Sequence, residues 1–152
     1  ESSDPAPLPE ESGDGVAKAC RFILASVLFG AKYAKKFDLS GVRFDDPVHN
    51  KIANYIRERQ EKGEQPRASA LFDIFSPDTP ELSAVLDLSL GDSLEGVGAA
   101  KYFEDCLRTV ERARLQEEMN RLSRLCDAET DVARKREMTR SLLSLAVKLK
   151  NL

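Results

Sequence analysis

The sequence has no tryptophan, a single histidine and three cysteines among its 152 residues. With His49 as the only imidazole, the chain cannot build a metal site from several histidines. The cysteines at positions 20, 106 and 126 lack the paired spacing of metal ligands, and an odd number of thiols is typical of a reducing compartment. The sequence therefore predicts a cytoplasmic protein without a metal ion or other cofactor.

Long apolar runs and phosphate-binding glycine motifs are also absent. No apolar run approaches the roughly 18 residues that a membrane span needs, and the N-terminus lacks the apolar region of a secretory signal. Neither G-x-x-x-x-G-K-[ST] nor G-x-G-x-x-G occurs. No serine or cysteine has an evident base beside it for nucleophilic catalysis. We therefore expect a protein that works by contact and is not an enzyme.

Charge is unevenly distributed along the chain. Residues 1–15 contain five acids and no base, whereas the remaining residues contain all 23 bases and 21 of the 26 acids, a net charge of +2. So small an excess argues against a dedicated nucleic-acid-binding domain. The acidic, proline-rich opening predicts a flexible linker over residues 1–15, and a linker at this place suggests a piece of a longer protein.

Apolar residues recur at helical spacing along most of the remaining chain, and no segment shows the alternation of a strand. Asp45-Asp46-Pro47 is a helix-start signal, with an acidic cap followed by proline at the first helical position. Predicted helices cover residues 16–29, 31–37, 47–62, 68–75 and 80–88. A glycine-rich hinge follows over 91–98. The sequence predicts an all-α fold in which residues 16–97 form a helical bundle.

Residues 99–152 contain neither glycine nor proline, and they predict a long helix to about Cys126, an acidic turn and a final helix. The apolar stripe of the long helix changes face at the five-residue step from Val110 to Leu115, by more than about 90°. The first half is thus expected to pack on the bundle and the second half on the final helix. That helix carries a heptad stripe of Met138, Leu142, Leu145, Leu149 and Leu152. Residues 98–152 therefore predict a long helix plus a C-terminal helical hairpin.

The final helix also carries apolar residues away from its stripe, together with six bases against one acid, Glu137. Apolar residues ringed by charge mark interaction surfaces when they are exposed. Two other interpretations remain open. The bases could form a solvated surface, which suits the C-terminus of a helix. The two apolar residues, Leu143 and Val147, could pack against the body of the domain. The candidate partner-binding residues are Arg136, Arg140, Leu143, Val147, Lys148 and Lys150.

Three segments resemble the C-terminal domain of bacterial DnaG-type primases. They are Arg21-Phe-Ile-Leu-Ala-Ser-Val-Leu28, Phe44-Asp-Asp-Pro47-Val-His49-Asn-Lys-Ile52-Ala-Asn-Tyr-Ile56, and Glu104-Asp-Cys-Leu-Arg108 followed by residues 112–115. The resemblance extends over about residues 16–152. It implies a helical bundle followed by a helical hairpin that binds the N-terminal domain of the hexameric DnaB-type replicative helicase. Zinc binding and RNA primer synthesis belong to upstream domains in that family.

The resemblance also implies architectural roles for the motif residues. Phe44 and Ile56 are expected in the core, Pro47 at the start of a helix, and His49 as the residue that holds the turn. It further implies that the domain recruits primase to the replication fork.

Two alternatives remain at this point. The Phe-x-x-Pro-x-His element also resembles the N-terminal domain of the helicase itself. The acidic lead-in and the end of the chain at Leu149-Lys-Asn-Leu152 favour the primase. The alternative from another class is a helical nucleic-acid-binding module that uses the basic final helix, and the small net charge argues against it.

Overall fold

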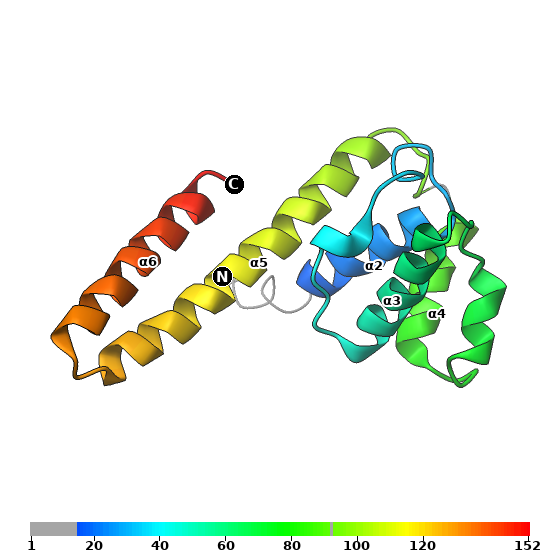
Figure 1. Cartoon of the computed structure of the whole chain (residues 1–152). Helices are drawn as coiled ribbons and strands as arrows, with labels where there is room; N and C mark the ends of the chain where they lie inside the picture. Colours follow the sequence, from blue (N-terminus) through cyan, green and yellow to red (C-terminus); the bar gives the residue numbers. More distant parts are fainter. Residues whose placement is uncertain (1–14, 92) are drawn as a thin grey trace, which may run out of the picture. The chain divides into compact units, whose positions relative to one another are not determined.

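The computed structural model describes residues 15–91 and 93–152, and the linker predicted over 1–15 lies outside them except for Gly15. The described residues contain helices and no strand, which confirms the predicted all-α class. None of these helices is both long and apolar enough to cross a membrane. In chain order the elements are α2 (Val16–Leu28), η2 (Leu39–Gly41), α3 (Pro47–Glu61), η3 (Ala68–Asp73), α4 (Pro80–Asp87), η4 (Leu88–Leu90), α5 (Ala99–Ala128) and α6 (Val132–Lys150) (Figure 1).

The chain divides into two compact units, the first ending at Val110 and the second comprising Glu111–Leu152. The division falls within α5, in the five-residue step where the apolar stripe changes face. The predicted boundary between the bundle and the following segment lay earlier, between residues 97 and 98. The first part of α5 thus belongs to unit 1 and its second part to unit 2.

Unit 1 is organised around α2, which contacts both α3 and α4. Nine of the 13 residues of α2 are buried, as expected of a helix that is apolar on nearly all sides. The neighbouring helices contribute Ile52, Ala53 and Ile56 from α3 and Leu82 and Val85 from α4. Phe103, Cys106 and Val110 of α5 complete the same core.

The helix starts agree with the local signals in the sequence. Asp46 caps α3, where its Oδ1 accepts hydrogen bonds from the backbone N–H groups of Val48 (2.8 Å) and His49 (3.4 Å), and Pro47 opens the helix. Gly30, with φ of 71°, follows the end of α2 in the left-handed region that glycine adopts at little cost.

The predicted helix over 31–37 is wrong. Residues 32–36 form successive turns, in which the Ala34 N–H bonds the Ala31 carbonyl and the Phe37 N–H bonds the Ala34 carbonyl. The Gln60 side chain of α3 donates to the Phe37 carbonyl oxygen at 2.6 Å, and Arg57 donates to the Val42 carbonyl oxygen at 2.6 Å. Gln60 of α3 therefore satisfies the carbonyl group at the end of this segment in place of a continuing helix, and Arg57 satisfies a carbonyl group just beyond it.

Two other predicted helices differ at the level of the turn. The segment predicted over 68–75 is the 3₁₀ helix η3, and the segment predicted over 80–88 ends as α4 at Asp87 and continues as η4.

Aromatic contacts hold the turns at 32–36 beside α5. The ring centroids of Tyr33 and Phe37 lie 5.2 and 5.3 Å from that of Phe103.

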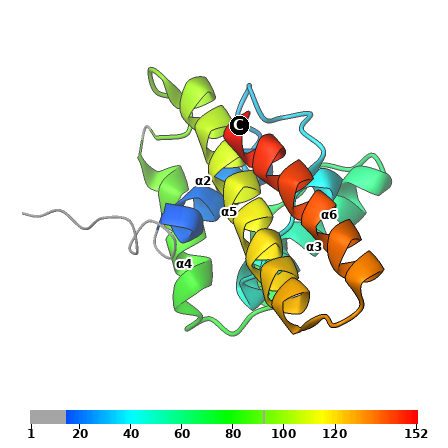
Figure 2. The same ribbon diagram turned by 90° about the vertical axis from the view of Figure 1, so that its left-hand side faces the viewer.

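Unit 2 consists of α6 and the second part of α5, which run antiparallel and side by side (Figures 1 and 2). Leu115 and Cys126 of α5 and Leu145 of α6 are buried. The other stripe residues are partly buried: Met119, Leu122, Met138, Leu142, Leu149 and Leu152. Asp131 caps α6 and accepts a hydrogen bond from the Arg134 N–H at 3.2 Å, which ends the acidic turn.

The buried thiols of unit 1 are expected to resist alkylation in the native protein. Burial raises the pKa of Cys20 to about 12, with a further increase from Asp45 and Asp46, and raises the pKa of Cys106 to about 11. Because the thiolate is the reactive species, iodoacetamide at about pH 8 should label both residues at least about a hundredfold more slowly than in the urea-unfolded chain. Peptide mass spectrometry measures both rates, and fast native labelling would contradict the buried placement.

Candidate functional site

The surface of α6 that faces away from its apolar stripe carries exposed apolar side chains. Leu143 is 63% exposed, Val147 is 59% exposed and Val132 is 66% exposed. Together with the bases at the same angular positions they form the outward face of α6, which consists of Val132, Arg136, Arg140, Leu143, Val147 and Lys150. At 100° per residue these six positions fall within about 90° of the helix circumference, roughly opposite Leu145.

Five of the six predicted partner-binding residues thus lie on one face: Arg136, Arg140, Leu143, Val147 and Lys150, and all are exposed. Lys148 is also exposed but lies off this face, since it follows Val147 by 100° around the helix. Its charge acts on Glu111 of α5, whose pKa is lowered mainly by a hydrogen bond from Arg114 and to a smaller extent by Lys148. Lys148 therefore lies on the side of α6 that faces α5.

Val132 was not among the predicted residues. The available signal was its spacing of eleven residues, or about three helical turns, from Leu143. Val132 is the first residue of α6, and a helix start cannot be placed with that precision from a pattern alone.

The outward face is cationic as well as apolar. Within the described residues Arg134 of α6 pairs with Glu129 at 3.9 Å, whereas Arg136, Arg140 and Lys150 have no acidic partner there. The one acid of α6, Glu137, lies at 100° from Arg136 and so off this face. Such a surface is suited to a partner that supplies both apolar contact and negative charge.

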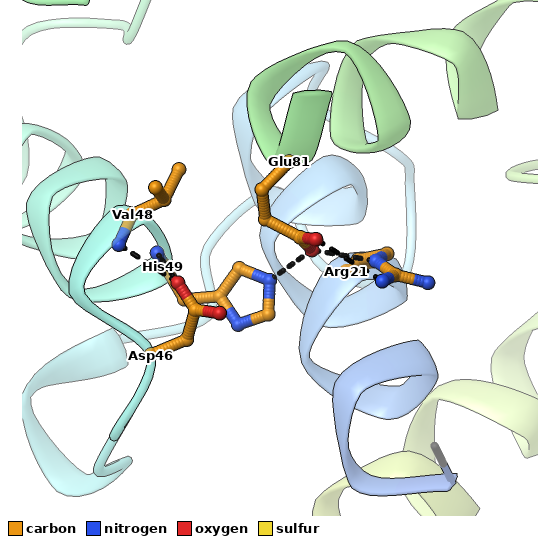
Figure 3. A network of polar contacts seen from close by, with 5 residues as sticks. All are labelled: Arg21, Asp46, Val48, His49 and Glu81. Atoms are coloured by element: carbon orange, nitrogen blue, oxygen red, sulfur yellow. Dashed lines mark hydrogen bonds and ion pairs between the residues drawn. The ribbon is translucent and has the colours of Figure 1, made fainter. Parts of the chain in front are cut away.

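The second candidate is a polar network in unit 1 (Figure 3). His49 of α3 is 1% exposed, and its ring Nε2 lies 2.5 Å from Glu81 Oε2 of α4. Arg21 of α2 donates from Nε to the same oxygen at 2.5 Å and from Nη2 to Glu81 Oε1 at 3.1 Å. The hydrogen bond from Arg21 is the main cause that lowers the pKa of Glu81, and the bond with His49 adds to it. The network therefore ties three helices together.

His49 thus makes a further contact beyond the turn that the resemblance implied. Its backbone N–H contributes to the turn through Asp46, but its ring reaches Glu81 on another helix. The Glu81 and Arg21 partners, 32 and 28 residues away from His49 in sequence, carry no local signal that could have predicted this contact.

Asp46, His49 and Glu81 offer three ligand atoms that lie within 4.8 Å of one another, the kind of cluster that can hold a metal ion. Both oxygens of Glu81, however, already accept hydrogen bonds from Arg21. A cation there would have to displace the guanidinium or lie against it, which like-charge repulsion opposes. The nearly complete burial of His49 also keeps a substrate from its ring. The arrangement therefore fits a structural network that joins three helices better than a metal or catalytic site.

Comparison of the chain with protein-family models, with curated proteins and with solved structures finds no match. The choice between the two candidates therefore rests on their geometry. The groups of the network bond to one another around the buried His49, whereas the bases on the exposed outward face of α6 have no acidic partner among the described residues. The outward face is therefore the better candidate for function.

Proposed function

We propose that this chain is the helicase-interaction domain of a bacterial DNA primase. It docks on the N-terminal domain of the DnaB-type replicative helicase and recruits primase for RNA primer synthesis at the replication fork. The observation that carries the proposal is the exposure of Leu143 and Val147, at 63% and 59%, among the bases of the outward face of α6.

The resemblance of three segments to DnaG-type primases supports the identity of the partner. Those segments lie in α2, in and just before α3, and in α5. Phe44 is 5% exposed, Ile56 is fully buried and Pro47 opens α3, so these motif residues occupy architectural positions. This leaves the exposed surface of α6 to make the contact, in the manner of an amphipathic helix that enters an apolar groove.

Truncation of the two exposed apolar side chains is expected to weaken helicase binding without unfolding the chain. Leu143→Ala with Val147→Ala removes two anchors and should lower the affinity for the cognate helicase hexamer by roughly 30- to 1000-fold. Isothermal titration calorimetry measures the affinity. The far-UV circular dichroism spectrum should stay unchanged because alanine is a good helix former at exposed positions.

Leu125→Ala is the matched control. Leu125 lies on α5 of the same unit, is 46% exposed and does not belong to the outward face. Its truncation should leave the affinity within about twofold. Unchanged affinity of the double variant would place the contact elsewhere, and absence of binding by the unaltered chain would refute the proposed function.

A further inference from the structure

The outward face of α6 is longer than the pair of residues that carries the proposed function. Val132, at the first position of α6, and Val147, near its last turn, are 15 residues apart. A helix rises 1.5 Å per residue, so these two side chains are separated by about 22 Å along the axis. A small pocket could hold Leu143 and Val147 together but could not also reach Val132.

The stripe has the spacing of a helix-packing surface. From Val132 the positions follow at intervals of four, four, three, four and three residues, the intervals that form ridges along one side of a helix. A helix has no free backbone N–H or C=O groups along its length, so an extended peptide would find no main-chain partners here. A second helix, in contrast, could place its own side chains between those of the stripe.

The charge of the face restricts which helix can occupy it. Arg136, Arg140 and Lys150 lie along it without an acidic partner among the described residues. A second copy of this face would bring like charges together, which opposes self-association through it. The aliphatic parts of the two arginines can cover apolar surface between Val132 and Leu143, while their guanidinium groups reach acids at its edge.

We infer that the partner element is an α-helix of at least four turns that packs lengthwise on the outward face of α6. Val132 is the anchor at one end of this contact, Leu143 and Val147 are the anchors at the other, and the partner helix carries Asp or Glu beside Arg136 and Arg140. This inference rests on the proposed function, and it specifies the kind of element on the helicase to which the domain binds.

Val132→Ala tests the length of the contact. With the full chain and the cognate helicase hexamer in calorimetry, this variant should bind roughly tenfold more weakly, and Leu125→Ala should bind unchanged. Val132→Thr keeps the branched shape but adds a hydroxyl group, and it should weaken binding as well if the site is desolvated. Circular dichroism checks that both variants remain helical.

Arg140→Glu tests the charge of the partner. It should weaken binding and reduce the salt dependence of association, whereas Arg124→Glu, an equal change of charge at an exposed position of α5, should have a smaller effect. Equal effects of the two variants would show that only the overall charge matters and would overturn the assignment of acids beside Arg140.

The outcomes separate the inference from the proposed function. If Val132→Ala binds like the unaltered chain while the Leu143 and Val147 double variant binds weakly, the lengthwise contact is refuted and helicase docking stands. If the unaltered chain does not bind the helicase, both are refuted. A dimer in analytical ultracentrifugation that Val132→Ala dissociates would identify a second copy as the occupant and would also overturn the inference.

Discussion

Leu145→Asp is expected to unfold unit 2 while unit 1 remains folded. Leu145 is 9% exposed and belongs to the apolar stripe that α6 turns toward α5. An aspartate at this position would lose much of its hydration without gaining a counter-charge, which costs more than about 3 kcal/mol. A unit of two helices has a small free energy of unfolding, because cores of this size rarely contribute more than about 3–5 kcal/mol of stability. The expected loss therefore approaches or exceeds the whole stability of the unit.

Hydrogen exchange measured by mass spectrometry reads this result unit by unit. Peptides from residues 111–152 should exchange at nearly the rate of an unfolded chain, and peptides from α2, α3 and α4 should keep their protection. The matched control is Leu143→Asp, because Leu143 lies only two residues away but is 63% exposed. It should change the stability by less than about 1 kcal/mol. Equal loss of protection in both variants would show that Leu143 is a core residue, and the outward face would then not exist as described.

The helix starts could be predicted because their signals are local. Asp46 and Pro47 set the start of α3, and Pro80 occupies the first position of α4. The apolar stripes were equally accessible, since burial of Leu115, Cys126 and Leu145 follows directly from helical periodicity.

The turns over 32–36 could not be predicted because distant residues decide them. The periodicity of Ala31 and Ala34 suits a helix, and both residues are indeed buried. The hydrogen bond that the Phe37 carbonyl group accepts in place of a helical one, however, comes from Gln60 of α3. A pattern within one segment carries no information about a donor on another.

The candidate site shows the same division. The residues on the outward face of α6 share one helix, so their angular positions could be calculated from spacing alone. The same spacing places Lys148 off this face, but its proximity to Glu111 could be learned only from the position of α5. The contact of His49 with Glu81 was beyond prediction because it joins α3 to α4 in space.

Glu81→Gln is expected to destabilise unit 1 by about 2 kcal/mol near neutral pH. The carboxylate accepts hydrogen bonds from Arg21 at 2.5 and 3.1 Å and lies 2.5 Å from the ring of His49. Hydrogen bonds to charged groups contribute roughly 1.5–3 kcal/mol, and the glutamine amide can replace only part of them. The Glu81 side chain is 21% exposed, which places the cost below that of a fully buried ion pair. Urea unfolding of the full chain measures the difference, with Glu104→Gln as the exposed control on α5.

The pH dependence of this difference identifies the carboxylate as its source. The folded protein lowers the pKa of Glu81, chiefly through the hydrogen bond from Arg21. A lowered pKa means that the stabilisation is complete above the unfolded value of about 4.3 and is lost as the pH falls through the folded value. The stability gap between the unaltered chain and Glu81→Gln should therefore be fully present at about pH 5. It should shrink as the pH falls below the unfolded value of about 4.3 and Glu81 takes up its proton in the folded chain. If the Glu81→Gln gap persists undiminished in acid, the variant destabilises unit 1 because the amide NH2 group cannot accept a hydrogen bond from Arg21. The negative charge of Glu81 would then not be what joins α2, α3 and α4.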